Sequence, residues 1–487
     1  MSMKTTGLRR IKGFCYKYFN IPRNNTNMRT EFLAGVTNYF TLIYAVMLVP
    51  EMLIGAFPGA LNENGEIIKD AVIYNGITAN HMLVTLTAIA FIAAGLASIF
   101  IGSLVNLPFV QGPSIAIGTF VTYTICIEYG YSYNQALALV FISGILFFIL
   151  AITGMEERLH KAIPSNLKFA VSAGIGFFIA CTGLVKAHII NLDQNGSFAG
   201  IFGMNMADKN NVSAVLAIVI VILIVVMLKR HVHGAIFIGK VICIIAAIPL
   251  GLVYMGNNLG FEYSVDVTAL ALKLDFNGLI DFTNNDTIIK TMVDIVVIVF
   301  SLCIMDIFET MSMLIAMDNY IDISHNGSKR KKNIPRILEV DAVTTSAGAL
   351  LGTTSVSTYV ESTAGVIEGG RTGLTSVITG ILFLATVPFT PLVSLVPSAA
   401  TATTLIVAGV LMMGVLKYID FEDITEAVPA FLTMILMPLT NSLLIGLCIG
   451  IISYVLIHIF VPHDKKISPL LYILGFFMFV TFVMLPR

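Results

Sequence analysis

Carboxylate, hydroxyl and glycine residues gather in one stretch of this chain, GTTSVSTYVESTAGVIEGGRTG, which runs from Gly352 to Gly373. An unpaired polar group in lipid hydrocarbon costs several kcal/mol, so a helix that faces lipid does not have this composition. Such a stretch persists at membrane depth only when protein buries it or when it lines a watery cavity. We therefore predict that it forms half of a substrate site near the middle of a membrane.

Glu361 lies where this stretch changes from extended backbone to a short helix. An ionisable side chain inside a membrane segment is a functional candidate, and a helix N-terminus stabilises its negative form. Because a carboxylate only accepts hydrogen bonds, it can bind the N–H edge of a planar heterocycle. Glu361, with Ser362 beside it, is therefore a predicted substrate-binding residue. The alternative is a carboxylate that only caps its own helix.

Two further carboxylates, Asp306 and Glu309, stand with Thr310 on one face of an apolar helix, at positions i, i+3 and i+4. Burial favours the neutral form of a carboxyl group, and two carboxylates one turn apart hinder each other's ionisation. One of the pair is predicted to carry a proton in one conformation and to release it in another. The alternative for Glu309 is a hydrogen bond to a neighbouring Ser or Thr and no more. The acids that flank the next basic loop are predicted to be solvated: Asp318, Asp322, Glu339 and Asp341.

The first half of the chain has a counterpart to the Glu361 stretch. There, residues 107–111 (LPFVQ) lead into Gly112-Pro113-Ser114 and a short helix that begins near Ile115. The leaders of both stretches favour extended backbone, and Pro113 suits a first helical turn. We predict two extended pieces that cross at the midplane, each opening into a half-helix whose free N–H groups point into a shared cavity. The alternative is two ordinary loops at the membrane surface.

The elements that position these residues are apolar helices. Of the 487 residues, 57% are hydrophobic and 12% are charged, whereas soluble domains carry roughly 25% charged residues. We therefore predict an all-α polytopic membrane protein with about 14 transmembrane segments. The segments lie near 33–56, 80–102, 113–127, 132–153, 164–184, 212–229, 234–255, 291–317, 338–352, 361–368, 373–395, 399–417, 425–439 and 441–461. A last apolar segment, 468–485, either spans the membrane or lies in its interface.

Cysteine and histidine usage gives no sign of a cofactor or metal site. The six cysteines are scattered singly, and the eight histidines lack ligand spacing. The motifs HExxH and GxSxG are absent, so nothing in the sequence supports a membrane-embedded enzyme.

Basic residues follow the even-numbered segments and also crowd the N-terminus, so those loops and the N-terminus are predicted to be cytoplasmic. The first thirty residues are polar and contain no apolar signal sequence, which favours a solvated orienting tail. The residues concerned are Lys4, Arg9, Arg10, Lys12, Lys17, Arg23, Arg29, Arg158, Lys161, Lys168, Lys229, Arg230, His231, Lys329, Arg330, Lys331, Lys332, Arg336, Lys465 and Lys466.

The two halves of the chain resemble each other. Residues 142–147 recur at 378–383, 163–165 at 396–398, and 173–175 at 408–410, with offsets of 236, 233 and 235 residues. Seven segments per copy is an odd number, so the second copy must cross the membrane upside down, as in secondary transporters. The predicted division is an N-terminal segment 1–30, a first repeat 31–255, an extracellular loop 256–290, a second repeat 291–461 and a C-terminal part 462–487.

From Glu31 onward the chain resembles the nucleobase–cation symporter-2 family, and especially its azaguanine-type purine permease branch. The likeness is carried by TSVSTYVESTAGVIEGGRTGLTS (354–376), by DIFET (306–310) and by DFEDITEAVPAFLTMILMP (420–438). It implies a seven-plus-seven inverted repeat with core and gate domains, dimeric through the gates. It also implies that Glu361 binds the nucleobase, that Asp306 contacts substrate and couples protons, and that Ser114 and Ile115 offer backbone hydrogen bonds.

Two departures lie beside the expected cavity. This chain reads SIAIGT at 114–119 where the branch has Gly-Met-Gly-Leu-Asn-Ala, and TMSM at 310–313 where the branch has Thr-Ala-Gly-Thr. The identity of the base is therefore left open.

The expectation is a secondary active transporter in the cell membrane that imports a purine base with a proton. Hypoxanthine and guanine are the first candidates for the substrate, followed by adenine and then by xanthine or uracil. A uracil or xanthine permease and an anion transporter or channel of the same fold are the alternatives, and acidic residues at the site argue against an anion. The expected partners are the bilayer, a proton rather than sodium, and a second copy of the chain. No nucleic acid, cofactor or enzymatic activity is expected.

Overall fold

A computed structural model describes residues 13, 16–61, 67–68, 70–155, 162–192, 198–201, 209–253, 265–279, 285–321, 333–440, 442–461 and 468–484. Many of the basic residues from which the orientation is predicted lie outside these ranges. They are Lys4, Arg9, Arg10, Lys12, Arg158, Lys161, Lys329, Arg330, Lys331, Lys332, Lys465 and Lys466. Asp322 lies outside them as well, so its predicted solvation and the orientation stay predictions.

The chain is mainly helical, and both halves follow one order of elements. Labels with α mark α-helices, labels with η mark 3₁₀- or π-helical segments, and labels with β mark strands. The first half contains η1 (Ile21–Asn24), α2 (Met28–Leu53), η2 (Ile54–Ala56), α3 (Ala79–Val105), β3 (Gln111–Pro113), α4 (Ile115–Thr119), η3 (Phe120–Glu128), α5 (Tyr133–Thr153), α7 (Ser165–Lys186), α8 (Lys209–Lys229) and α9 (Ala235–Ala247). The second contains α10 (Asn285–Ile321), α11 (Asn333–Leu351), β6 (Val356–Thr358), η6 (Val360–Ser362), α12 (Thr363–Ile367), α13 (Gly373–Thr386), η7 (Val387–Leu395), α14 (Ser398–Met412), η8 (Met413–Tyr418), α15 (Ile424–Leu439) and α16 (Leu443–Phe460). After these comes α17 (Pro469–Met484), and the connections carry β1 (Val72–Tyr74), β2 (Ile77–Thr78), β4 (Ile190–Leu192), β5 (Phe198–Ile201), η4 (Val267–Ala269) and η5 (Asn277–Leu279).

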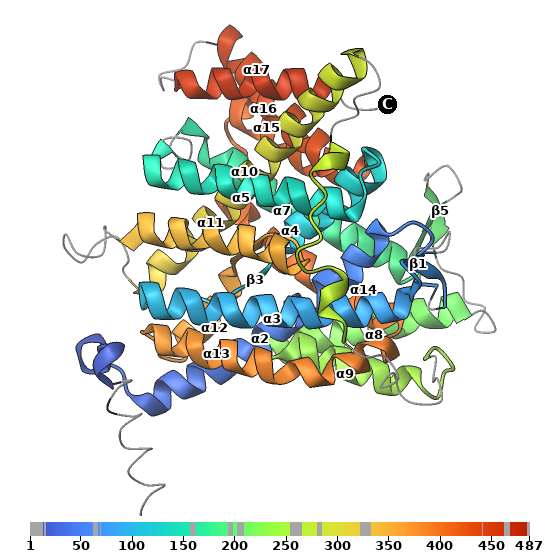
Figure 1. Cartoon of the computed structure of the whole chain (residues 1–487), viewed down its shortest axis with the longest axis vertical. Helices are drawn as coiled ribbons and strands as arrows, with labels where there is room; N and C mark the ends of the chain where they lie inside the picture. The colour runs from blue at the N-terminus through green and yellow to red at the C-terminus, as the bar shows by residue number, and fades with distance from the viewer. Residues whose placement is uncertain are drawn as a thin grey trace, which may run out of the picture.

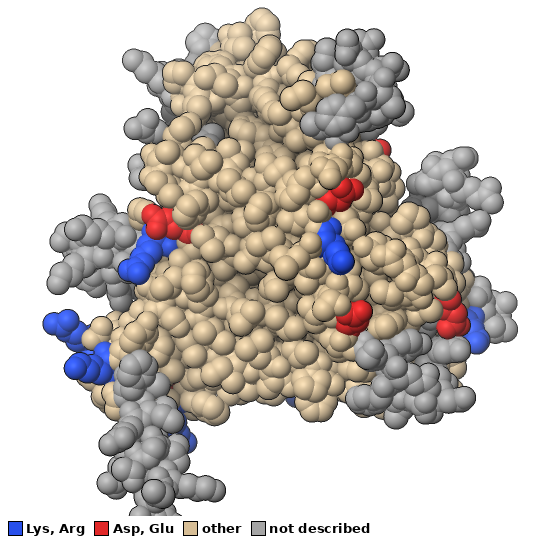
Figure 2. Space-filling model, in the orientation of Figure 1, with Lys and Arg blue, Asp and Glu red and all other residues tan. Residues whose placement is uncertain are grey.

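Length and composition make this a membrane-spanning fold. Within the described ranges, eight helices are long and apolar enough to cross a bilayer, and four shorter apolar helices accompany them. On the face drawn in Figure 2, most of the surface carries neither basic nor acidic side chains. The predicted all-α polytopic membrane protein is confirmed.

Local sequence signals begin and end these helices. The side chain of Asn27 caps α2 by accepting a hydrogen bond from the Thr30 backbone N–H, at 3.0 Å. Ser132 and Gln135 form a reciprocal capping box at the start of α5, and Gly154 ends that helix with φ 67°, a left-handed conformation that glycine adopts without strain.

The helices pack mainly within two groups. The group that we call the core contains α2, α3, α4, α5, α10, α11, α12 and α13 with both intramembrane strands, and the group that we call the gate contains α7, α8, α9, α14, α15 and α16. Figure 1 shows the blue α2 and α3 beside the orange α13, so elements from both halves of the sequence build the core. Contacts between α2 and α9 join the two groups.

The two predicted extended pieces meet as a short antiparallel pair near the centre of the molecule (Figure 1). In β3 and β6, Gln111 lies opposite Thr358, and Pro113 lies opposite Val356. One hydrogen bond beyond each end continues the ladder: Ser114 N–H donates to the Ser355 carbonyl at 2.8 Å, and the Tyr359 N–H donates to the Val110 carbonyl at 3.0 Å. The prediction of strands that cross before two half-helices is confirmed.

Glycines allow α3 and α13 to approach closely. A Cβ added at Gly95 would lie 2.9 Å from the Gly380 carbonyl oxygen, and one added at Gly102 would lie 2.6 Å from that of Gly373. The two glycines of each helix are seven residues apart, so each pair lies on one helix face. The contact holds the end of the Glu361 stretch against the first half of the chain.

Candidate functional site

A cavity of about 330 Å³ lies between the core and the gate, beside the strand crossing. The core lines it from the start of α4, from α10, and from the chain between β6 and α12; the gate lines it from α7 and from the end of α14. The lining residues are Ser114, Ile115, Lys168, Val171, Ser172, Ile175, Met305, Glu309, Ser357, Thr358, Tyr359, Glu361, Thr363, Leu411, Met412 and Val415. Lys168, predicted to belong to a cytoplasmic loop, instead lies in the first turn of α7 and reaches the cavity.

Glu309 joins the two half-helix motifs. It accepts hydrogen bonds from the hydroxyl of Ser114 at one oxygen and from that of Ser357 at the other, both at 2.8 Å. Ser114 also caps α4 by accepting from the Ile117 N–H at 3.0 Å. The carboxylate therefore holds the start of α4 against β6, and it lines the cavity at the same time.

Asp306 lies one layer behind the cavity lining. It is 1% exposed, and it accepts hydrogen bonds from Thr345 at 2.7 Å and from Ser355 at 2.9 Å. The hydroxyls of Thr345 and Ser355 are also 3.0 Å apart. The Asp306 carboxylate on α10 is therefore held by α11 and by the residue just before β6. A buried carboxyl group held by hydroxyls, without a cation among these partners, can take up and release a proton.

The prediction that Asp341 is solvated is wrong. Its side chain is fully buried, and the Gln111 amide donates to it at 2.7 Å, the Thr358 hydroxyl at 3.0 Å and the Thr310 hydroxyl through a short contact. Asp341 lies near the middle of α11, where it meets the strand crossing instead of water. The signal that could have identified this site is Gln111, a polar side chain in an apolar leader that requires a buried partner.

Glu361 lies just before α12 and lines the cavity together with Tyr359. Among the described side chains, the Tyr44 hydroxyl of α2 donates to it, at 3.3 Å. A second cavity of about 240 Å³ also reaches Glu361, from the loop between α8 and α9. Glu361 thus borders both cavities, and one described side chain donates to it.

The seven predicted site residues divide into two sets. Ser114, Ile115, Glu309 and Glu361 line the cavity, and Asp306, Thr310 and Ser362 lie behind it. Thr310 donates to Asp341, and Ser362 accepts from the Val110 N–H at 3.0 Å, so both side chains brace the strand crossing.

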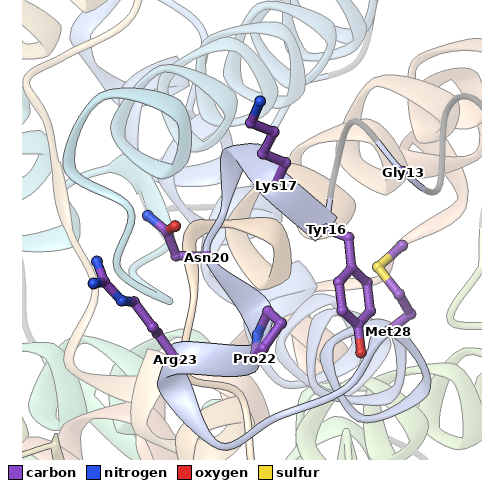
Figure 3. Close-up of a pocket in the computed structure, with 7 residues that line it drawn as sticks. All are labelled: Gly13, Tyr16, Lys17, Asn20, Pro22, Arg23 and Met28. Carbon is purple, nitrogen blue, oxygen red and sulfur yellow. The ribbon is translucent and has the colours of Figure 1, made fainter.

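A larger hollow, about 660 Å³, lies in the N-terminal segment, away from these carboxylates (Figure 3). The labelled side chains of Lys17, Arg23 and Tyr16 point away from one another there, and no element of the strand crossing lines it. Its size alone does not make it the functional site. Within the described part of the chain, no group of three or more His, Cys, Asp or Glu side chains is arranged to hold a metal ion.

Two helix groups around a strand crossing, with carboxylates beside a cavity at membrane depth, define a multi-pass transporter fold. Solved structures show the same fold. The transmembrane domain of the cyanobacterium bicarbonate transporter BicA matches with a TM-score of 0.57 and 16% identity, covering 87% of this chain and 97% of that one. The structure of SLC26A9 matches with a TM-score of 0.57 and 11% identity, covering 95% of this chain and 71% of that one. The chain is thus built as a seven-plus-seven inverted repeat.

Sequence comparisons identify the family. The model of the Permease family, that of the xanthine and uracil permeases, matches residues 29–449. The chain is 31% identical over 474 residues to the guanine/hypoxanthine permease PbuG of Bacillus subtilis (strain 168), covering 96% of this chain and 98% of the relative. It is 30% identical over 444 residues to the adenine permease AdeQ of Escherichia coli (strain K12), covering 91% and 90%. The chain belongs to this permease family, the nucleobase–cation symporters-2, as its motifs predicted.

Proposed function

We propose that this protein imports a purine nucleobase across the cell membrane by alternating access, in symport with a proton. The observation that supports this most directly is the position of Glu361, a carboxylate with free acceptor capacity at the junction of two cavities. A purine presents N–H donors in the plane of its rings: guanine has N1–H and N2–H side by side, which one carboxylate can accept together, and hypoxanthine and adenine each offer an N–H that it can accept singly.

The remaining lining suits a flat heterocycle. The cavity between the core and the gate has a volume of about 330 Å³, within the range of roughly 300–1,000 Å³ typical of small-molecule sites. The ring of Tyr359 and the side chains of Ile115 and Ile175 offer apolar faces. Ser114 and Ile115 begin a short helix at the cavity wall, where the N–H groups of Ser114 and Ile117 are already bonded and those of the first turn between them remain candidates to donate to a ligand. This arrangement supports the proposed substrate-binding roles of Glu361, Ser114 and Ile115.

Asp306 and Glu309 are the proposed proton-coupling residues. Glu309 lies at the cavity surface, and Asp306 lies behind it on the same helix face. Both are held by hydroxyls, which can donate to a carboxylate or accept from a carboxyl group without moving. Proton transfer at this pair therefore requires no rearrangement of the strand crossing. Thr310 and Ser362 act behind the lining, as supports.

The relatives' names favour a purine: they describe an adenine permease and guanine/hypoxanthine permeases. The solved structures with bicarbonate or anion carriers are too distant in sequence to assign a substrate. The cytoplasmic N-terminus and a dimer through the gate helices belong to the same proposal.

Uptake in a host that lacks purine transport tests the proposal. Labelled hypoxanthine, guanine and adenine are each supplied, with unlabelled bases as competitors, over a range of pH and with or without sodium. We expect saturable uptake of a purine that rises as the external pH falls and does not depend on sodium. Chloride or sulfate movement in proteoliposomes, without uptake of any base, would contradict it.

A further inference from the structure

An ion pair lies inside the membrane where the core meets the gate, apart from the carboxylates described above. Lys240 Nζ donates to Glu51 Oε1 at 2.8 Å, and the side chains are 1% and 3% exposed. Glu51 lies near the end of α2 in the core, and Lys240 lies in α9 of the gate. Both helices are otherwise apolar over these turns.

Stability alone does not account for such a pair. The cost of removing two charges from water can equal or exceed their attraction, and apolar replacements of similar volume are often as stable. Charges placed inside a membrane mark functional positions for the same reason. Glu51 Oε2 is buried and accepts no hydrogen bond from the described residues, so the carboxylate is held through one oxygen.

The pair is connected to the candidate site through α2. Tyr44, whose hydroxyl donates to Glu361, precedes Glu51 by two helical turns, about 10 Å along the axis. Across the interface, Ile236 lies one turn before Lys240 on α9 and lines the second cavity with Tyr44. One face of α2 thus contacts the Glu361 carboxylate and the gate lysine.

The lining of both cavities indicates which conformation the pair accompanies. The cavity of about 330 Å³ between the core and the gate is lined by Lys168 in the first turn of α7. Met412 at the end of α14 and Val415 in η8 line it as well. The smaller cavity is lined by the loop from His231 to Gly234. These positions are on the side of the membrane where α2 begins, whereas Glu51 lies near the opposite end of that helix.

We propose that the Glu51–Lys240 pair is a latch that holds the core against the gate in the conformation whose cavity faces the side where α2 begins. Movement of the core along the gate separates the two charges, and the pair re-forms when the core returns. This inference rests on the alternating access proposed above. Because it concerns the free energy difference between two conformations, it makes no claim about which solute is carried.

Labelling of a cavity cysteine tests the latch without any substrate. In a background whose six native cysteines are replaced, Val415→Cys reports cavity opening through its rate of reaction with a bulky maleimide in purified protein. The double substitution Glu51→Gln with Lys240→Met removes both charges of the pair. We expect its labelling rate to fall, because about 1 kcal/mol of lost stabilisation lowers the ratio of the open to the closed conformation about fivefold.

Reversing the charges separates an ion-pair effect from general damage. Glu51→Lys with Lys240→Glu should restore the labelling rate of the parent to within about twofold, whereas each reversed residue alone should not. Glu422→Gln, on an exposed loop, is the control for a neutral change and should leave the rate unaltered. A folded double variant that labels as fast as the parent, or a reversed pair that stays slow, would overturn the latch.

Uptake measured in parallel keeps the two proposals apart. If the parent carries no purine while the double variant still labels more slowly, the proposed function fails and the latch stands. If the parent carries a purine and the labelling rates are equal, the latch fails and the proposed function stands.

Discussion

Glu361 differs from the other carboxylates around the strand crossing in how fully its oxygens are occupied. Asp341 accepts hydrogen bonds from three side chains, and Glu309 and Asp306 each accept from two hydroxyls. Among the described side chains, one donates to Glu361: the Tyr44 hydroxyl, at 3.3 Å. Three acids therefore fix the backbone of the site, and the fourth has free lone pairs for a ligand.

Replacing Glu361 with Gln should reduce purine uptake by about 10- to 100-fold, since hydrogen bonds to a charged group contribute about 1.5–3 kcal/mol each. The substitution keeps the shape of the side chain but turns one acceptor into a donor that faces the base. Labelled uptake and the amount of protein in the membrane are measured together, with Glu422→Gln as the control on an exposed loop. Uptake at the parental rate would remove Glu361 from the site.

Asp341→Asn should lower stability as well as transport. Three donors point at the carboxylate oxygens, and an amide would turn its own N–H₂ group toward at least one of them. Leaving a buried donor unpaired costs about 1–3 kcal/mol, so the Tm of the purified protein should fall by several degrees. Glu339→Gln, two residues earlier on the same helix and half-buried, is the matched control and should change the Tm little. Equal Tm values for the two variants would show that the Asp341 network does not brace the crossing.

Sequence reasoning located some of these residues and missed others for a physical reason. Glu361 is predicted because it lies in a local run of polar residues that lipid cannot accommodate, and Ser114 because the resemblance to the permease family implies a role for it. Asp341, Glu51 and Lys240 are single charges in or beside apolar helices, and their partners lie far away in the sequence. Only the folded chain shows that Asp341 meets Gln111, or that Glu51 meets Lys240.

At the scale of elements, the strand crossing depends on helices that approach more closely than ordinary side chains allow. Gly373 begins α13 directly after the Glu361 stretch, and a Cβ added there would overlap the Gly102 carbonyl of α3. Nothing in the local sequence indicates that Gly373 contacts another helix. Whether a glycine serves a turn or a helix contact depends on tertiary packing, which a single sequence does not display.

Gly373→Ala should therefore push α13 away from α3 and destabilise the protein. Overpacking of this kind costs about 1–3 kcal/mol, which corresponds to a drop in Tm of several degrees. Gly414→Ala is the matched control, because a Cβ added at Gly414 in η8 meets nothing within 4 Å. The Tm of each detergent-purified variant is compared with that of the parent. If both substitutions proved equally mild, close packing of α3 on α13 would not be essential.

At the scale of the whole molecule, transport by alternating access requires the core to move against the gate. The two groups meet where Phe40 of α2 lies against Gly234, just before α9: a Cβ added at Gly234 would be 3.0 Å from the Phe40 Cβ. This contact lies on the same interface as the Glu51–Lys240 pair but nearer the side where α2 begins.

Cysteines at Phe40 and Gly234, introduced together in a background without native cysteines, should form a disulfide once the backbone at Gly234, which has a φ of 70°, shifts to accept a side chain. The shift also has to bring the Cβ atoms to the separation of about 3.5–4.5 Å found in disulfides. Oxidation should then stop uptake, and dithiothreitol should restore it, because the bond prevents the core from moving. Each single cysteine variant should be insensitive to the oxidant. Continued uptake by the cross-linked protein would mean that these helices do not move relative to each other.

Because β3 pairs with β6, both halves of the polypeptide contribute to the candidate site. Each half contributes one strand and one half-helix, and backbone hydrogen bonds join the two strands. The protein thus resembles two opposed subunits joined into one chain, with the candidate site where their strands pair. Two separately expressed halves should accordingly be inert alone and regain a common pocket only by associating in the same bilayer.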